Sequence, residues 1–159
     1  MVSRRHVLGL AGACLTAGCS VLSDSTRTPR PRPDDYNTYD ESVFNDRGRA
    51  TISEGEHGSF EFSSDRKMEV SYDLWVHDDA EIDIVVYSRA EYDDYTSGDP
   101  ASHIPDVTEF QTASEERSRF VDPGEYVLVV DNTDNATNAV EPSVTVEYTI
   151  SVMTYDDEA

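Results

Sequence analysis

Alternation of apolar and polar residues from about residue 58 onward restricts the chain to β-structure. It is clearest in KMEVSYDLWVH, residues 67–77, and in SVTVEYTISVMT, residues 143–154. A period of two places every second side chain on one face of a strand. The apolar sets are Met68, Val70, Tyr72, Leu74 and Val76 in the first segment and Val144, Val146, Tyr148, Ile150 and Val152 in the second. Both segments predict antiparallel strands with one face in a core and the other in water.

Further strands are predicted before and between these two segments. Residues 58–62, 81–88 and 124–132 alternate or form short apolar runs, and residues 106–110 and 116–121 do so more weakly. About seven short strands in about 100 residues, bounded by Gly, Pro, Asn and Asp, are typical of a β-sandwich. We therefore predict an all-β fold, a single antiparallel β-sandwich of the jelly-roll-like kind.

One short helix interrupts the predicted strands. The sequence SRAE at 88–91 has the S-x-x-E spacing of a capping box. Tyr92 and Tyr95 are three residues apart, which places them on one face of a helix, and Gly98 is a typical end signal. We expect a helix over residues 88–97, inside a crossover that continues to residue 106.

The first 18 residues have the composition of an export signal. Arg4 and Arg5 precede an apolar, glycine-rich run of about a dozen residues, which is too short to cross a bilayer as a helix. The adjacent arginines resemble the twin-arginine signal, and LTAGC at residues 15–19 resembles a lipobox. The resemblance implies cleavage before Cys19 and a lipid on its sulfur. The alternative is an ordinary cleaved signal in which Cys14 and Cys19 are incidental.

Residues 19–50 show neither a helical nor a strand period. Prolines alternate with arginines from Pro29 to Pro33, and acidic residues and tyrosines follow. Alternating proline favours an extended, semi-rigid spacer. The predicted segments are therefore a signal peptide over 1–18, the lipidated cysteine with a disordered tether over 19–50, and the β-sandwich domain over 51–155. Because the sandwich segment contains no cysteine, its stability is expected to come from a core without a disulfide.

The charge of the chain is strongly negative. It has 33 acidic and 12 basic residues, a formal net charge of −21, and Lys67 is its single lysine. Such a charge destabilises a compact state in dilute buffer, but at molar salt the Debye length falls to about 3 Å and screens the repulsion. With the leader, this composition indicates a halophilic archaeal protein. An acidic domain that binds cations or a basic partner is the alternative. Nucleic acid is excluded as a partner because no basic face is present to displace counterions.

The order of elements from residue 54 to 154 resembles a known group of domains. The resemblance is carried by IDIVVYS (82–88), AEYDDYTSGD (90–99) and RFVDPGEYVLVVDNTD (119–134). It is similar to the GOLD-like and pre-peptidase C-terminal-like β-sandwich domains of secreted and surface proteins. That resemblance implies a binding or accessory module without catalytic activity. Pro123-Gly124 is expected to form a tight turn with a positive φ at the glycine.

No catalytic residues, metal site or cofactor are predicted. A blue-copper site needs a cysteine thiolate, which the exported segment lacks, and His57, His77 and His103 have no metal-ligand spacing. The oxygen-rich run at 131–135 offers ligands for calcium, although a solvated turn explains it equally well. Asn135 begins the glycosylation sequon Asn-Ala-Thr.

One group of side chains is predicted to form an interaction patch. If alternate residues point into the core, then Trp75, His77, Val85 and Tyr87 point outward from consecutive strands. Exposed apolar patches often mark binding sites. The alternative is that the tether, the 88–106 crossover or the other sheet covers these residues.

These features together predict an exported module held by its lipid at the outer side of the cell membrane. The expected function is non-catalytic binding of a surface protein or glycan by the outward-facing patch. A structural envelope spacer without a ligand is one alternative. A solute-capturing lipoprotein or degenerate enzyme is another, which the small size of a single sandwich disfavours.

Overall fold

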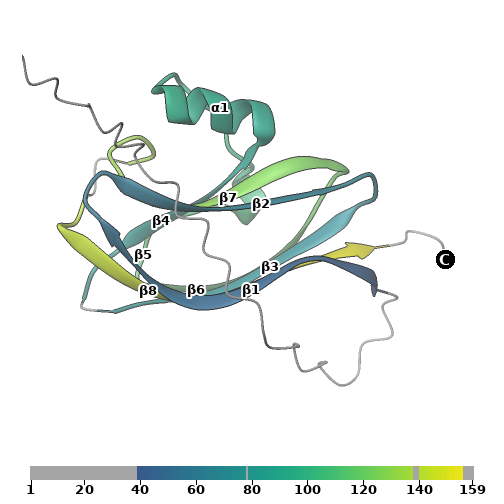
Figure 1. Cartoon of the computed structure of the whole chain (residues 1–159), viewed down its shortest axis with the longest axis horizontal. Helices are drawn as coiled ribbons and strands as arrows, with labels where there is room; N and C mark the ends of the chain where they lie inside the picture. Colours follow the sequence, from purple (N-terminus) through teal and green to yellow (C-terminus); the bar gives the residue numbers. More distant parts are fainter. Residues whose placement is uncertain (1–38, 78, 138–139, 156–159) are drawn as a thin grey trace, which may run out of the picture.

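A computed structural model describes residues 39–77, 79–137 and 140–155 of the 159-residue chain. Two four-stranded antiparallel sheets pack face to face, and one short helix lies on the outside of one of them (Figure 1). The all-β sandwich predicted from the sequence is confirmed. The strands are β1 (Tyr39–Ser53), β2 (Glu56–Ser64), β3 (Met68–Val76), β4 (Ile82–Ser88), β5 (Glu109–Thr112), β6 (Ser114–Val121), β7 (Gly124–Asn132) and β8 (Ser143–Tyr155).

The strand order identifies the sandwich as a jelly roll. One sheet has the order β1-β8-β3-β6 and the other the order β2-β7-β4-β5. Consecutive strands therefore alternate between the sheets, except where β4 is followed by β5, and all neighbouring strands are antiparallel. Strand pairing in this order brings the two ends of the described chain, β1 and β8, side by side.

The core lies between the inner faces of the two sheets. Met68, Leu74 and Ile150 of one sheet and Ile84 and Leu128 of the other are completely or almost completely inaccessible to solvent. Their alternating positions in the sequence are those expected for the inner face of each strand. The predicted apolar faces of residues 67–77 and 143–154 are thus confirmed.

The predicted tether was wrong for the residues nearest the sandwich. The first strand begins at Tyr39, and β1 pairs with β8 along nearly its whole length. Its apolar period is hidden in the sequence because Asp46 and Gly48 occupy inward-facing positions. The glycine leaves room for Tyr148, whose hydroxyl would lie 2.7 Å from an added Cβ. That hydroxyl donates to the buried Asp46. The remainder of the predicted tether, residues 19–38, and the leader lie outside the described residues.

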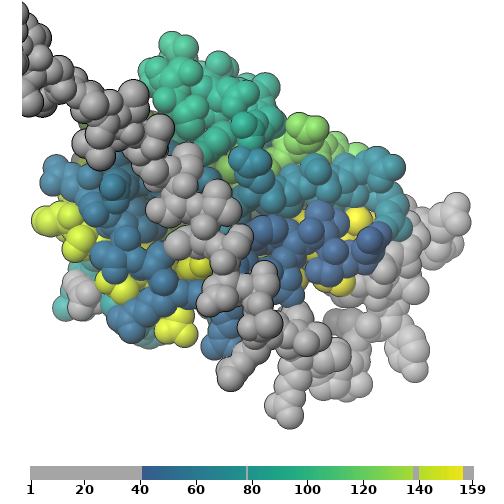
Figure 2. Space-filling model, viewed as in Figure 1, coloured from purple at the N-terminus to yellow at the C-terminus, as the bar shows by residue number. Residues whose placement is uncertain are grey.

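The helix predicted in the crossover is confirmed as α1 (Arg89–Ser97). Ser88 caps it by accepting the N–H of Glu91. The capping box is only half formed, because the Glu91 carboxylate accepts the N–H of Ser102 instead of returning to Ser88. Gly98 ends the helix with φ of 78° and donates its N–H to Tyr95. Figure 2 shows α1 as a ridge standing above the strands.

Two local predictions were wrong. The segment 106–110 is divided between a 3₁₀ turn (Pro105–Val107) and the start of β5. Gly124 opens β7 without a positive φ. The reason for a glycine there is packing, since an added Cβ would lie 3.1 Å from the ring of Tyr126, whose hydroxyl donates to the Asp122 carbonyl.

Candidate functional site

The predicted interaction patch is divided between the two sheets. Trp75 lies on β3 and Val85 and Tyr87 lie on β4, so the two groups belong to opposite layers of the sandwich. The inference from alternation was correct for the direction of each side chain, but consecutive strands in a jelly roll are not neighbours in one sheet. The prediction of one patch made of all four residues is therefore wrong.

Helix α1 covers the outer face of the β2-β7-β4-β5 sheet. Val85 is fully buried and Tyr87 is 4% exposed. The Tyr87 ring stacks on Tyr95 with centroids 5.1 Å apart, and Tyr95 stacks on Tyr92 at 6.0 Å. The alternative in which the crossover covers these residues is thus correct, and the helix tyrosines form a second core with Val127 and Val129 instead of extending a surface patch.

Polar residues lie at the end of this second core. His57, Asp131 and Asp83 are aligned across β2, β7 and β4. Asp131 is 2% exposed; its Oδ1 accepts the N–H of Thr133, and its Oδ2 meets no donor. Burial raises the pKa of Asp131, and the nearby hydroxyls of Thr133 and Tyr95 offset part of this rise. Burial lowers the pKa of His57, against the opposing effect of Asp131.

The neighbouring Asp83 is fully engaged in the fold. Its Oδ1 accepts the N–H of Gln111 at 2.7 Å, and its Oδ2 accepts the hydroxyl of Thr137 at 2.6 Å. The first of these bonds fastens β5 at a residue with a φ of 53°. Among the described residues, no three His, Cys, Asp or Glu side chains are grouped so as to hold a metal ion. The turn after β7 is instead closed by side chains that bond the backbone, at Asp131, Asn132 and Thr133.

The other sheet presents an outer face that no described element covers (Figure 1). We call this the open face; it is formed by the outward residues of β1, β8, β3 and β6. Register places Arg49, Glu147, Trp75 and Ser114 in one row across the four strands. The adjacent row, two residues along each strand, contains Arg47, Thr149, Asp73 and Glu116.

Trp75 is the most exposed large apolar side chain of the open face. It is 59% exposed, more than Phe120 at the other end of the same face. Phe120 packs on Tyr155 and Lys67, whereas Trp75 has no ring or cation contact within residues 39–77, 79–137 and 140–155. His77 lies beside it, with Nε2 3.8 Å from the Glu147 carboxylate. Of the predicted patch, only Trp75 and His77 therefore remain on an accessible surface.

The two arginines of β1 were missed because they fall in the predicted tether. Both are exposed, and in the described part of the chain neither guanidinium has a hydrogen bond or an ion pair. Other arginines differ: Arg66 pairs with Glu41 at 3.6 Å, and Arg89 pairs with Glu61 at 2.7 Å. The sequence signal that could have located Arg47 and Arg49 is their alternation with the inward residues of β1, which a glycine and an aspartate obscure.

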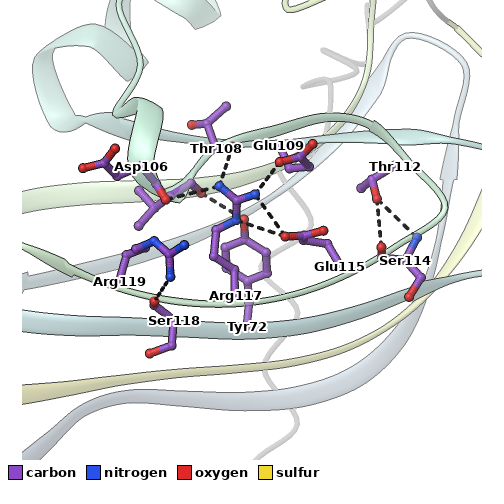
Figure 3. A network of polar contacts seen from close by, with 11 residues as sticks. Tyr72, Asp106, Thr108, Glu109, Thr112, Ser114, Glu115, Arg117, Ser118 and Arg119 are labelled. Atoms are coloured by element: carbon purple, nitrogen blue, oxygen red, sulfur yellow. Dashed lines mark hydrogen bonds and ion pairs between the residues drawn. The ribbon is translucent and has the colours of Figure 1, made fainter.

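The arginine with the most hydrogen bonds, Arg117, has a structural role. Arg117 of β6 bridges to the segment before β5, where it donates to the carbonyls of Asp106 and Thr108 and pairs with Glu109 and Glu115 (Figure 3). All its nitrogens are engaged. Tyr72 donates to the Val107 carbonyl beside it, and burial raises the pKa of this tyrosine. The network fastens the edge between the two sheets and leaves no free group for a ligand.

The remaining predicted residues are distributed away from these clusters. Asn135 is exposed, and the threonine of its sequon is bonded to Asp83. Arg4, Arg5 and Cys19 lie outside the described residues. Two hollows of about 280 Å³ lie on the covered side, one beside Glu61 and Arg89 and the other beside Tyr87 and Asp134. In the described part of the chain no helix has the length and apolar character needed to span a bilayer.

Comparison with known proteins assigns neither a family nor a function to the chain. No family model matches the sequence, and no curated protein matches it. One similar solved structure is that of a family GH115 4-O-methyl-α-glucuronidase, BtGH115A, with specificity for decorated arabinogalactans. It is 14% identical, with a TM-score of 0.37, and the match covers 84% of this chain. The match spans only 20% of that enzyme's length. This likeness carries no argument about activity.

Proposed function

We propose that the chain is an exported, lipid-anchored β-sandwich that acts as a non-catalytic binding module on the outer side of the cell membrane. The location follows from the resemblance of Arg4 and Arg5 to a twin-arginine signal and of residues 15–19 to a lipobox. The anchor is the lipid on Cys19. The net charge of −21 supports a protein from very salty surroundings, where its self-repulsion is screened.

The observation that carries the binding function is the exposed Trp75 on the open face. The other sheet covers its outer apolar residues with a dedicated helix, whereas the indole of Trp75 is left 59% exposed among polar neighbours. A large aromatic side chain presented in this way is the type of residue that dominates binding energies. The exposed Glu147 carboxylate beside it supplies a hydrogen-bond acceptor, whereas Nε2 of His77 is buried.

Binding is tested most cleanly without the lipid, because the anchor would itself retain the protein. A Cys19→Ser variant is expected to lose the lipid mass and to leave the membrane fraction. Its retention on washed envelopes of the producing cells at molar KCl then measures binding by the open face without a contribution from the lipid. Trp75→Ala in this background is expected to reduce retention about tenfold or more, the loss that a hot-spot residue of 1–2 kcal/mol gives.

The matched control is Phe110→Ala on β5, which removes another partly exposed aromatic ring from the opposite sheet. It is expected to leave envelope retention unchanged. Equal retention of the Trp75→Ala and parent proteins would contradict the binding role and favour an envelope spacer. Cytosolic protein with residues 1–18 intact would contradict the export and the anchor.

A further inference from the structure

We infer that the ligand of the open face is a polysaccharide bearing carboxylate or sulfate groups. This inference rests on the proposed binding function and names the chemistry of its ligand. It is carried by two independent features of one surface: the exposed indole of Trp75 and the unpartnered guanidinium groups of Arg47 and Arg49.

The surroundings of Trp75 favour a sugar over a protein partner. Its neighbours in the same row are Ser114 and Glu147, and His77 lies close to the same carboxylate. A protein hot spot is typically surrounded by contacts that exclude water from an apolar centre. Here the ring of Trp75 is surrounded by hydroxyl, carboxylate and imidazole groups. Such a flat aromatic platform can stack against the C–H face of a sugar ring, while the polar groups bond its hydroxyls.

The arginines indicate that this sugar polymer is anionic. In a chain with 33 acidic and 12 basic residues, Arg66, Arg89 and Arg117 each pair with a carboxylate, and Arg119 donates to a backbone carbonyl. Arg47 and Arg49 form no ion pair in the described part of the chain, although Glu147 lies opposite Arg49, and both point outward from the same edge strand. A guanidinium offers a planar pair of donors that matches a carboxylate or sulfate in bidentate fashion.

The spacing of the open face suits an extended chain of sugars. Arg49 and Trp75 lie on strands separated only by β8, hence about 10 Å apart between backbones. A polymer lying across the strands can therefore stack one ring on Trp75 and direct an acidic group of an adjacent unit towards Arg49. Glu147 and Asp73 lie between and beside these contacts and accept hydroxyl donors. Molar salt screens the long-range repulsion from the rest of the chain, and it weakens exposed contact pairs less than it weakens this repulsion.

The probes are hyaluronate, polygalacturonate and chondroitin sulfate, with neutral dextran as the comparison. The lipid-free Cys19→Ser protein is passed over each immobilised polymer at molar KCl, and its retention is measured. We expect retention by at least one acidic polymer and not by dextran. Trp75→Ala and the double variant Arg47→Gln/Arg49→Gln are each expected to weaken it about tenfold, the effect of losing a charge-assisted hydrogen bond or stacked ring.

The control for charge is Arg89→Gln/Arg119→Gln, which removes two exposed arginines placed outside the open face. It is expected to retain full binding. Equal retention on dextran, equal loss in the charge control, or no retention on any acidic polymer would overturn the inference. Sedimentation with phosphatidylglycerol vesicles but not retention by the polymers would also overturn it, in favour of a lipid surface.

The envelope assay separates this inference from the function on which it rests. If Trp75→Ala abolishes envelope retention while no acidic polymer is bound, the ligand class is wrong and the binding role stands. If Trp75→Ala leaves envelope retention unchanged, the binding role fails and the ligand class fails with it.

Discussion

The two sheets are built alike on the faces that meet in the core and differently on the faces that point away from it. On the β2-β7-β4-β5 sheet, Val85, Tyr87, Val127 and Val129 make the outer face apolar, and α1 covers it. On the other sheet, the outer face carries mainly charged and hydroxyl side chains around Trp75, with Phe120 at its far end, and no described element covers it. The fold thus covers the apolar outer face of one sheet with a helix and leaves Trp75 of the other sheet accessible to a ligand.

The covered face is expected to contribute far more to stability than the open one. Tyr87→Ala should lower the free energy of unfolding by about 3–5 kcal/mol, because it removes a buried aromatic ring and leaves a cavity beneath α1. Thermal and guanidinium unfolding at molar KCl, followed by circular dichroism, measure this loss. A Tyr87→Phe control keeps the ring and should lose much less. A loss below about 1 kcal/mol for the alanine variant would show that the helix does not seal this face.

The buried carboxylate under the covered face is expected to reduce stability at neutral pH. Burial raises the pKa of Asp131 above its ordinary 3.8, so the folded state holds a proton that the unfolded state releases. The contribution of Asp131 to stability therefore falls as the pH rises from the pKa of the unfolded state to that of the folded state. Asp131→Asn keeps the acceptor for the Thr133 N–H and removes the unpartnered charge. It should stabilise the protein by about 1–2 kcal/mol at pH 7.

The pH dependence of this variant is the stricter part of the prediction. The advantage of Asp131→Asn should shrink as the pH falls towards 4, because protonation of the parent carboxyl in the folded state removes its buried charge. Asp134→Asn, at an exposed position nearby, is the matched control. Unfolding curves at pH 7 and pH 4 give the comparison. Destabilisation by Asp131→Asn at pH 7 would mean that a cation compensates the charge of Asp131 in the folded protein.

The sequence shows which strands are buried on both faces and which on one, but it does not show which outward residues lie on the same sheet. Continuous apolar runs at 84–87 and 127–130 mark strands buried on both sides, and alternation at 67–77 and 143–154 marks strands with one wet face. Local patterns thus predicted most of the strands, the helix and its caps, but not β1. They could not tell that Trp75 and Tyr87 lie on opposite layers, since the partner of a strand depends on long-range pairing.

The misplaced start of the domain has a similar physical origin. Strand β1 was taken for tether because Asp46 and Gly48 break its apolar period, and both residues are explained only by Tyr148 of β8, a hundred residues away in sequence. Arg47 and Arg49 of the open face were missed for the same reason, because they lie on β1. Local sequence signals are weakest where a strand owes its conformation to a distant partner.

The seal over the covered face depends in part on the first turn of α1. Ser88 accepts the N–H of Glu91, and its replacement by alanine leaves that donor without a protein partner. Ser88→Ala is expected to cost about 1 kcal/mol, and Ser88→Asp only a few tenths, because aspartate can cap in the same way. Unfolding at molar KCl tests both. Equal losses in the two variants would show that the cap does not control the helix, whose attachment would then depend on its tyrosines alone.

The smallest effect on stability is expected where the effect on binding is largest. Trp75→Ala should change the free energy of unfolding by less than about 0.5 kcal/mol, because most of the ring is in water. The measurement is the same unfolding experiment used for Tyr87→Ala. A loss comparable to that of Tyr87→Ala would mean that Trp75 is buried in the native protein, and a residue buried in the free protein cannot be the platform for a ligand. A negligible loss combined with weakened envelope retention instead assigns the indole to recognition.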